Sequence, residues 1–140
     1  MKRRIGFLRF VYLYGAAFDG LMLIPMLSPA VGARMLGIAE FRPGPDYRYA
    51  MGVAAALMAG WTALLVWGVL DPVARRGALL LTAAPVSAGL VAAGLYAVAA
   101  GLVALPDMAP IFAFQTAGIA LFVAGYRTAG RLGASATKTP

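Results

Sequence analysis

Asp19 stands alone as an acidic residue inside a long apolar stretch of the sequence. An ionised aspartate in the middle of a membrane helix costs about 2.5 to 3.5 kcal/mol. The carboxyl group must therefore be paired, hydrogen-bonded within the fold or protonated. Because desolvation disfavours the charged form, we expect Asp19 to be neutral at rest.

The other predicted membrane helices each carry a hydrogen-bonding side chain at the depth of Asp19. That depth is about nine residues from the cytoplasmic end of a helix, or roughly 13 to 14 Å at 1.5 Å per residue. Gln115 is the sole carboxamide in the chain, and with Asp19 it is the side chain most costly to leave in lipid. The sequence predicts a polar layer formed by Asp19, Trp61, Thr62, Ser87, Gln115 and Thr116.

Three interpretations of this layer remain open. It can be structural, fixing helix register through hydrogen bonds worth under about 2 kcal/mol each. It can be a ligand or ion site, in which Asp19 exchanges a proton or holds the polar head of a lipid-like molecule. It can be an enzyme site, with Asp19 as general acid or base on an apolar substrate. A paired-carboxylate mechanism is disfavoured, because the remaining acids fall in predicted loops: Glu40, Asp46, Asp71 and Asp107.

The chain contains no cysteine and no histidine. It therefore cannot hold haem through imidazole or thiolate, build a Cys/His zinc site or use a Ser-His-Asp relay. Phosphate-cradling glycine patterns of the types GxGxxG and GxxxxGK[ST] are also missing. We expect a protein with no metal and no cofactor of its own.

The composition indicates a membrane protein. Apolar residues make up 62% of the 140 and charged residues 12%, whereas soluble domains average about 45 to 50% and 25%. Four segments approach the roughly 20 apolar residues that span a bilayer: 10–33, 49–70, 78–105 and 110–126. We predict an all-α fold, a polytopic antiparallel bundle of four transmembrane helices forming one domain over residues 1–129. Residues 130–140 are expected to be a disordered tail.

Prolines set further expectations for these segments. Pro25, Pro29 and Pro85 should each bend or end a helix, because proline removes a backbone hydrogen bond. Pro110 suits the first turn of the last helix, where an N–H would lack a partner in any case.

The distribution of basic residues predicts that both termini are cytoplasmic, in a membrane that we expect to be the bacterial inner membrane. Most of the net charge of +7 is then explained by membrane insertion and not by nucleic-acid binding. The first segment could also be a signal peptide, but Asp19 would interrupt its apolar region. Nine basic residues fall on the cytoplasmic side and three opposite: Lys2, Arg3, Arg4, Arg9, Arg75, Arg76, Arg127, Arg131 and Lys138, against Arg34, Arg42 and Arg48.

Small residues recur at a spacing of four, which in lipid allows helix backbones to approach closely. In a chain with 17 glycines such stripes also arise by chance. The predicted packing positions are Gly52, Ala56 and Gly60 in the second segment, and Gly89, Ala93, Ala97 and Gly101 in the third.

In size and hydropathy the chain resembles several small four-helix bacterial membrane families, DoxX-like families among them. The resemblance implies an architecture and no activity. With minimal loops, the chain is predicted to be an accessory or interaction subunit of a membrane complex, or a small homo-oligomer. The alternatives are a cofactor-free membrane enzyme that uses Asp19 and a proton-linked transporter of small molecules. The expected partners are the bilayer, a membrane protein or a second copy, and a lipid-like molecule.

Overall fold

The structure, a computed structural model, describes residues 2–136 and is helical throughout its regular elements. Helices α4 and α5 join through the π-helical turn η1, so the chain forms five continuous helices. Four of these are long and apolar enough to cross a membrane, which confirms the predicted all-α fold. The elements are α1 (Lys2–Leu27), α2 (Pro29–Met35), α3 (Pro45–Leu70), α4 (Gly77–Leu81), η1 (Thr82–Ser87), α5 (Ala88–Ala99) and α6 (Leu105–Ala136).

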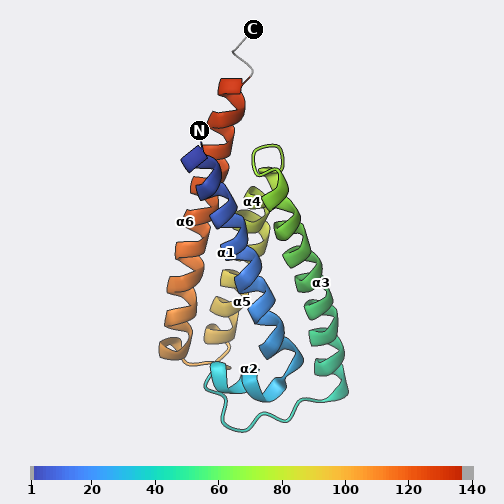
Figure 1. The fold of residues 1–140 in the computed structure, drawn as a ribbon. Coiled ribbons are helices and arrows are strands. Elements are labelled where there is room, and N and C mark those ends of the chain that lie inside the picture. Colours follow the sequence, from blue (N-terminus) through green and yellow to red (C-terminus); the bar gives the residue numbers. More distant parts are fainter. Residues whose placement is uncertain (1, 137–140) are drawn as a thin grey trace.

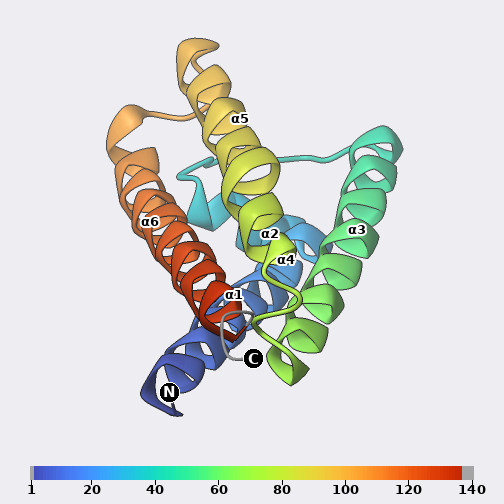
Figure 2. The same ribbon diagram turned by 90° about the horizontal axis from the view of Figure 1, so that it is seen from above.

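The long helices run alternately up and down (Figure 1). Helix α1 is central, because it packs against both α3 and α6, while α4, η1 and α5 pack against α6. Seen from above, α3 lies against α1 and apart from α6 (Figure 2). Helix α1 begins and α6 ends at one end of the bundle, which we call the basic end. The short helix α2 lies at the opposite end (Figure 1).

The first predicted span is two helices and not one. Helix α1 passes Pro25 and ends at Leu27, and Ser28 is extended with φ −117° and ψ 96°. The residue before a proline is driven out of the α conformation, and Pro29 then suits the first turn of α2. Helix α2 turns back on α1 so closely that a Cβ on Gly32 would lie 3.0 Å from the Pro25 carbonyl oxygen.

The third span continues past Pro85 through the π-helical turn η1. A π turn is a common way for a helix to absorb a disturbed backbone hydrogen bond. The Ser87 hydroxyl donates to the Thr82 carbonyl oxygen at 2.8 Å, which satisfies an acceptor within the turn.

The fourth span differs from its prediction at both ends. Helix α6 begins at Leu105, so Pro110 lies inside the helix and not in its first turn. The helix also continues to Ala136, so residues 130–136 are helical where the sequence predicts a disordered tail; residues 137–140 lie outside the described residues. Tertiary contact accounts for the extension, because Ala129 is buried and a Cβ on Gly130 would lie 2.7 Å from Arg76 Nη1.

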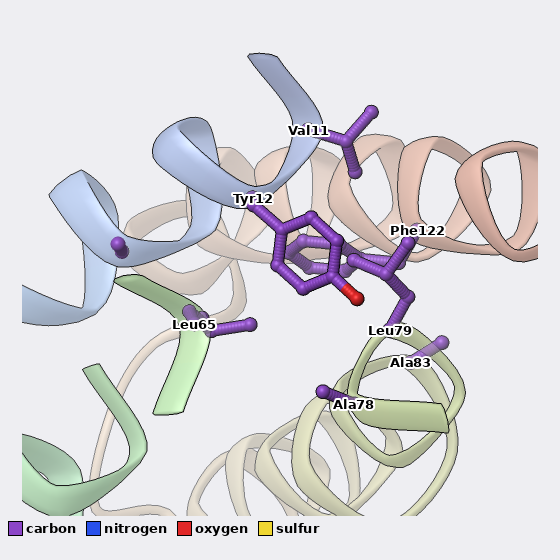
Figure 3. Packing of buried hydrophobic residues seen from close by; sticks show 8 residues of the cluster. Val11, Tyr12, Leu65, Ala78, Leu79, Ala83 and Phe122 are labelled. Atoms are coloured by element: carbon purple, nitrogen blue, oxygen red, sulfur yellow. The ribbon is translucent and has the colours of Figure 1, made fainter. Parts of the chain in front are cut away.

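One half of the bundle, toward the basic end, has a tightly packed apolar core. The Tyr12 ring fills the space between α1, α3 and α4 (Figure 3), and its hydroxyl donates to the Arg75 carbonyl oxygen at 2.8 Å. Gly68 on α3 makes room for this ring, since a Cβ there would overlap it. The cluster consists of Val11, Tyr12, Ala16, Leu65, Ala78, Leu79, Ala83 and Phe122.

Substituting Gly68 with alanine should therefore destabilise the protein. The added methyl group meets the ring of Tyr12, and overpacking of this kind typically costs about 1 to 3 kcal/mol. Gly60→Ala is a matched control on the same helix, because a Cβ there meets nothing within 4 Å. Thermal unfolding in detergent, followed by circular dichroism, should show a lower midpoint for Gly68→Ala only. Equal midpoints for the two variants would contradict the Tyr12 packing.

The predicted small-residue stripes do not pack the helices of this chain together. A Cβ on Gly52, Gly60, Gly89 or Gly101 would meet nothing within 4 Å, and Ala56 and Ala93 are exposed. Ala97 is half-buried. Their contact with another chain stays a prediction. The glycines in close contact within the fold are instead Gly15, Gly68, Gly94 and Gly125.

Candidate functional site

Asp19 lies where the packed half of the bundle ends. The buried residues of α1 recur every three or four positions from Leu8 to Asp19, and none of the residues from Gly20 to Leu27 is buried. Asp19 is 8% exposed, although it is ionisable. Its side chain is thus placed inside the bundle by the same helical face that carries the apolar core.

Asp19, Ser87 and Gln115 line one small cavity between α1, η1 and α6. Its volume is about 30 Å³. A site of about 10 to 15 Å³ holds one water molecule, so this cavity has room for a small polar group. The rest of the wall is largely apolar and aromatic: Tyr14, Gly15, Phe18, Thr82, Val86, Leu90, Phe114, Gly118 and Phe122.

Two oxygen atoms in this site accept no hydrogen bond from the described residues. They are Asp19 Oδ2 and Gln115 Oε1, and both are buried. No hydrogen bond joins the two side chains. A buried polar atom without a partner destabilises a fold by about 1 to 3 kcal/mol. Such atoms are rare in native proteins, and they often mark a place where another molecule binds.

The neighbouring hydroxyl groups cannot supply the missing donors, because their protons are already used. Ser87 donates to the Thr82 carbonyl oxygen, and Thr82 Oγ1 donates to the Ala78 carbonyl oxygen at 2.8 Å. Thr82 Oγ1 also accepts a hydrogen bond from Trp61 Nε1 at 3.1 Å. The site therefore presents free acceptors and is complementary to a hydrogen-bond donor.

The predicted polar layer is only partly assembled in one place. Trp61 does not line the cavity and reaches Thr82 instead. Thr62 donates to the Met58 carbonyl oxygen at 2.9 Å, within its own helix. Thr116 is exposed and donates to the Phe112 carbonyl oxygen at 2.8 Å. Thr82, which the sequence reasoning missed, is buried in the site.

A much larger cavity of about 480 Å³ adjoins the small one on the side away from the packed core. Ligand pockets typically measure about 300 to 1,000 Å³. Five of the seven methionines line it, and their flexible, polarisable side chains adapt to varied apolar shapes. The wall comprises Phe18, Met22, Pro25, Met26, Met35, Leu36, Met58, Leu90, Gly94, Ala97, Leu102, Val103, Met108, Pro110, Ile111, Phe114 and Gln115.

The two cavities share part of their walls. Phe18 and Phe114 line both, and their rings stack with centroids 4.1 Å apart. Gln115 also lines both, so its carboxamide lies at the junction. The arrangement combines an apolar chamber with a polar end that carries the unpaired oxygen atoms of Asp19 and Gln115.

Comparison with protein-family models, curated proteins and solved structures found no match. The resemblance to small four-helix bacterial families is therefore one of size and hydropathy. Among residues 2–136, no group of three or more acidic, cysteine or histidine side chains could hold a metal ion.

Proposed function

We propose that this chain is an integral membrane protein that binds a small amphiphilic molecule. The apolar body of the ligand occupies the methionine-lined cavity, and a hydroxyl or amine at its head donates to Asp19 and Gln115. The observation that carries the proposal is the pair of buried, unpaired acceptor oxygens at the polar end of an apolar cavity.

A purely structural layer accounts less well for these side chains. In such a layer the polar groups bond one another across helices. Here the hydrogen bond between helices joins Trp61 to Thr82, whereas Asp19 and Gln115 have no partner. Their burial is unfavourable for the chain alone and becomes favourable when a donor arrives.

The proposal is tested with two probes of similar size, 1-decanol and decyl methyl ether, added to the purified protein in detergent. Both have an apolar chain, but only the alcohol can donate a hydrogen bond. A ligand that binds the folded state raises the unfolding midpoint in proportion to its affinity. We expect 1-decanol to bind about tenfold more tightly, which corresponds to one well-placed hydrogen bond. Equal shifts for the two probes would contradict the proposed polar end.

An interaction role is the second candidate, and the outer face of α3 favours it. Gly52, Ala56 and Gly60 lie exposed beside Val53 and Leu57, which are 45% and 72% exposed. This face can receive a helix of a second copy or of another membrane protein, as in an accessory subunit. Cross-linking of a Gly60→Cys variant in membranes tests this role, because the chain has no other cysteine.

Catalysis and proton-linked transport are extensions of the same site. Either would require Asp19 to exchange a proton with the bound molecule. An Asp19→Asn variant that still binds 1-decanol but loses a turnover or a flux would support one of them.

We further propose that the basic end faces the cytoplasm of a bacterial cell. The support is the excess of lysine and arginine where α1 begins, where α6 ends and in the α3–α4 connection. Protease accessibility of either terminus in inverted membrane vesicles tests this orientation.

A further inference from the structure

A second cavity with different chemistry lies at the basic end, between the beginning of α1 and the end of α6. Its volume is about 370 Å³. Three of its five lining residues are arginines, and they come from both helices. The lining residues are Arg3, Arg4 and Phe7 of α1 and Thr128 and Arg131 of α6. We call this cavity the arginine cleft.

The arginines of this cleft differ from their neighbours in the α3–α4 connection. Arg75 donates to the Trp67 carbonyl oxygen and lies 3.6 Å from the Trp67 ring centroid. Arg76 lies over the Tyr126 ring at 5.6 Å. Within the described part of the chain, Arg3, Arg4 and Arg131 have no ion pair, side-chain hydrogen bond or ring contact.

No acidic side chain offsets this charge within the cleft, which has no carboxylate in its wall. The first turn of α1 also lacks an acidic residue, so the positive pole of this 26-residue helix adds to the same field. Bringing three like charges together is unfavourable unless an anion binds between them. The exposed guanidinium groups are free to bind one.

We propose that the arginine cleft binds a phosphate group, and that an anionic phospholipid supplies it. Guanidinium groups match the geometry of phosphate oxygens through paired N–H donors. The cleft lies at an end of the predicted spans, where lipid headgroups are found, and basic pockets between membrane helices commonly hold such headgroups. Phe7 adds an apolar surface for the glycerol and upper acyl region. This inference is independent of the ligand proposed for the methionine-lined cavity.

The test compares two double variants of the full chain that each remove one charge from α1 and one from α6. Arg4→Gln with Arg131→Gln changes the cleft, whereas Arg9→Gln with Arg127→Gln leaves its lining intact. Native mass spectrometry in detergent then measures binding of phosphatidylglycerol and of zwitterionic phosphatidylcholine. At about fivefold for each basic residue lost, the cleft variant should bind phosphatidylglycerol about 25-fold more weakly than the unmodified chain. The control variant should change by less than about threefold.

Inorganic phosphate at millimolar concentration distinguishes the source of the group. If it does not displace phosphatidylglycerol, the lipid assignment is supported; if it does, the site binds soluble phosphate and the lipid assignment fails. Equal weakening in both double variants would overturn the cleft itself, because it would show diffuse attraction to the whole basic end. Equal unfolding midpoints of the two variants verify that each is folded.

Discussion

Asp19→Leu should make the protein more stable and at the same time remove its preference for an alcohol. The substitution replaces a buried carboxyl that has an unpaired oxygen with an apolar group of similar size. Removing such an atom typically gains about 1 to 3 kcal/mol. The free energy of unfolding should rise by that amount, and 1-decanol should bind about ten times more weakly, to the level of decyl methyl ether.

Asp19→Asn separates the possible forms of the carboxyl group. It keeps the shape and one acceptor oxygen but can carry no charge. If Asp19 is neutral, as the sequence predicts, the asparagine variant should bind 1-decanol within about threefold of the unmodified chain. A matched loss in the asparagine and leucine variants would instead indicate an ionised carboxylate.

Thr116→Val is the control for these variants, since Thr116 is exposed and bonds only within its own helix. Its unfolding midpoint and its decanol affinity should both stay unchanged. Urea or thermal unfolding in detergent measures all the stabilities. A lower stability for Asp19→Leu would contradict the binding proposal and favour a structural polar layer, because the carboxyl group would then support the fold.

Depth could be predicted from the sequence for the candidate site, but direction around a helix could not. Counting residues inward placed Asp19, Ser87 and Gln115 at one level, and the structure brings them to one cavity. The same count included Thr116, which is one residue from Gln115 and thus about 100° around the helix. It is exposed for that reason.

Thr82 was missed because its position depends on an irregular backbone. It lies five residues before Ser87, a spacing that an α-helix does not place on one face. The π turn around Pro85 brings the Ser87 hydroxyl to the Thr82 carbonyl oxygen. Proline indicated a disturbance at this point, but the sequence did not specify whether the helix would bend, end or widen.

Helix packing was harder to predict than helix formation. The four spans follow from composition and length alone, since the bilayer fixes both. Close contacts depend on which large side chain faces each glycine. Gly68 accommodates Tyr12, and Gly15 lies against Phe122, from distant parts of the chain. A spacing of four among small residues carries no information about these partners.

The same partners explain why the bundle is filled in one half and hollow in the other. Toward the basic end, Tyr12, Leu79 and Phe122 fill the space between the helices. Toward α2, the break at Ser28 turns the chain back on itself, and adaptable methionines line the space that remains. Asp19 lies at the boundary, which places a polar group at the inner end of the hollow half.

Filling that hollow half should abolish binding without unfolding the protein. Ala97 of α5 lines the methionine-lined cavity and is half-buried. A phenylalanine at this position would occupy space that the apolar body of the ligand requires. Forcing a ligand against such a ring typically costs about 2 kcal/mol, so Ala97→Phe should bind 1-decanol about 30-fold more weakly. Cavity-filling substitutions usually leave stability unchanged or raise it, and the unfolding midpoint should not fall.

Ala93→Phe is the matched control, because Ala93 lies one turn earlier on the same helix and is exposed. It adds the same ring outside the cavity, and the decanol affinity should remain within about twofold. Titration of each variant with 1-decanol, followed by the shift in unfolding midpoint, gives the comparison. Undiminished binding by Ala97→Phe would show that the alcohol lies elsewhere in the protein–detergent particle. Loss in both variants would indicate that the added ring acts through the surface of α5, and the cavity would then have no part in binding.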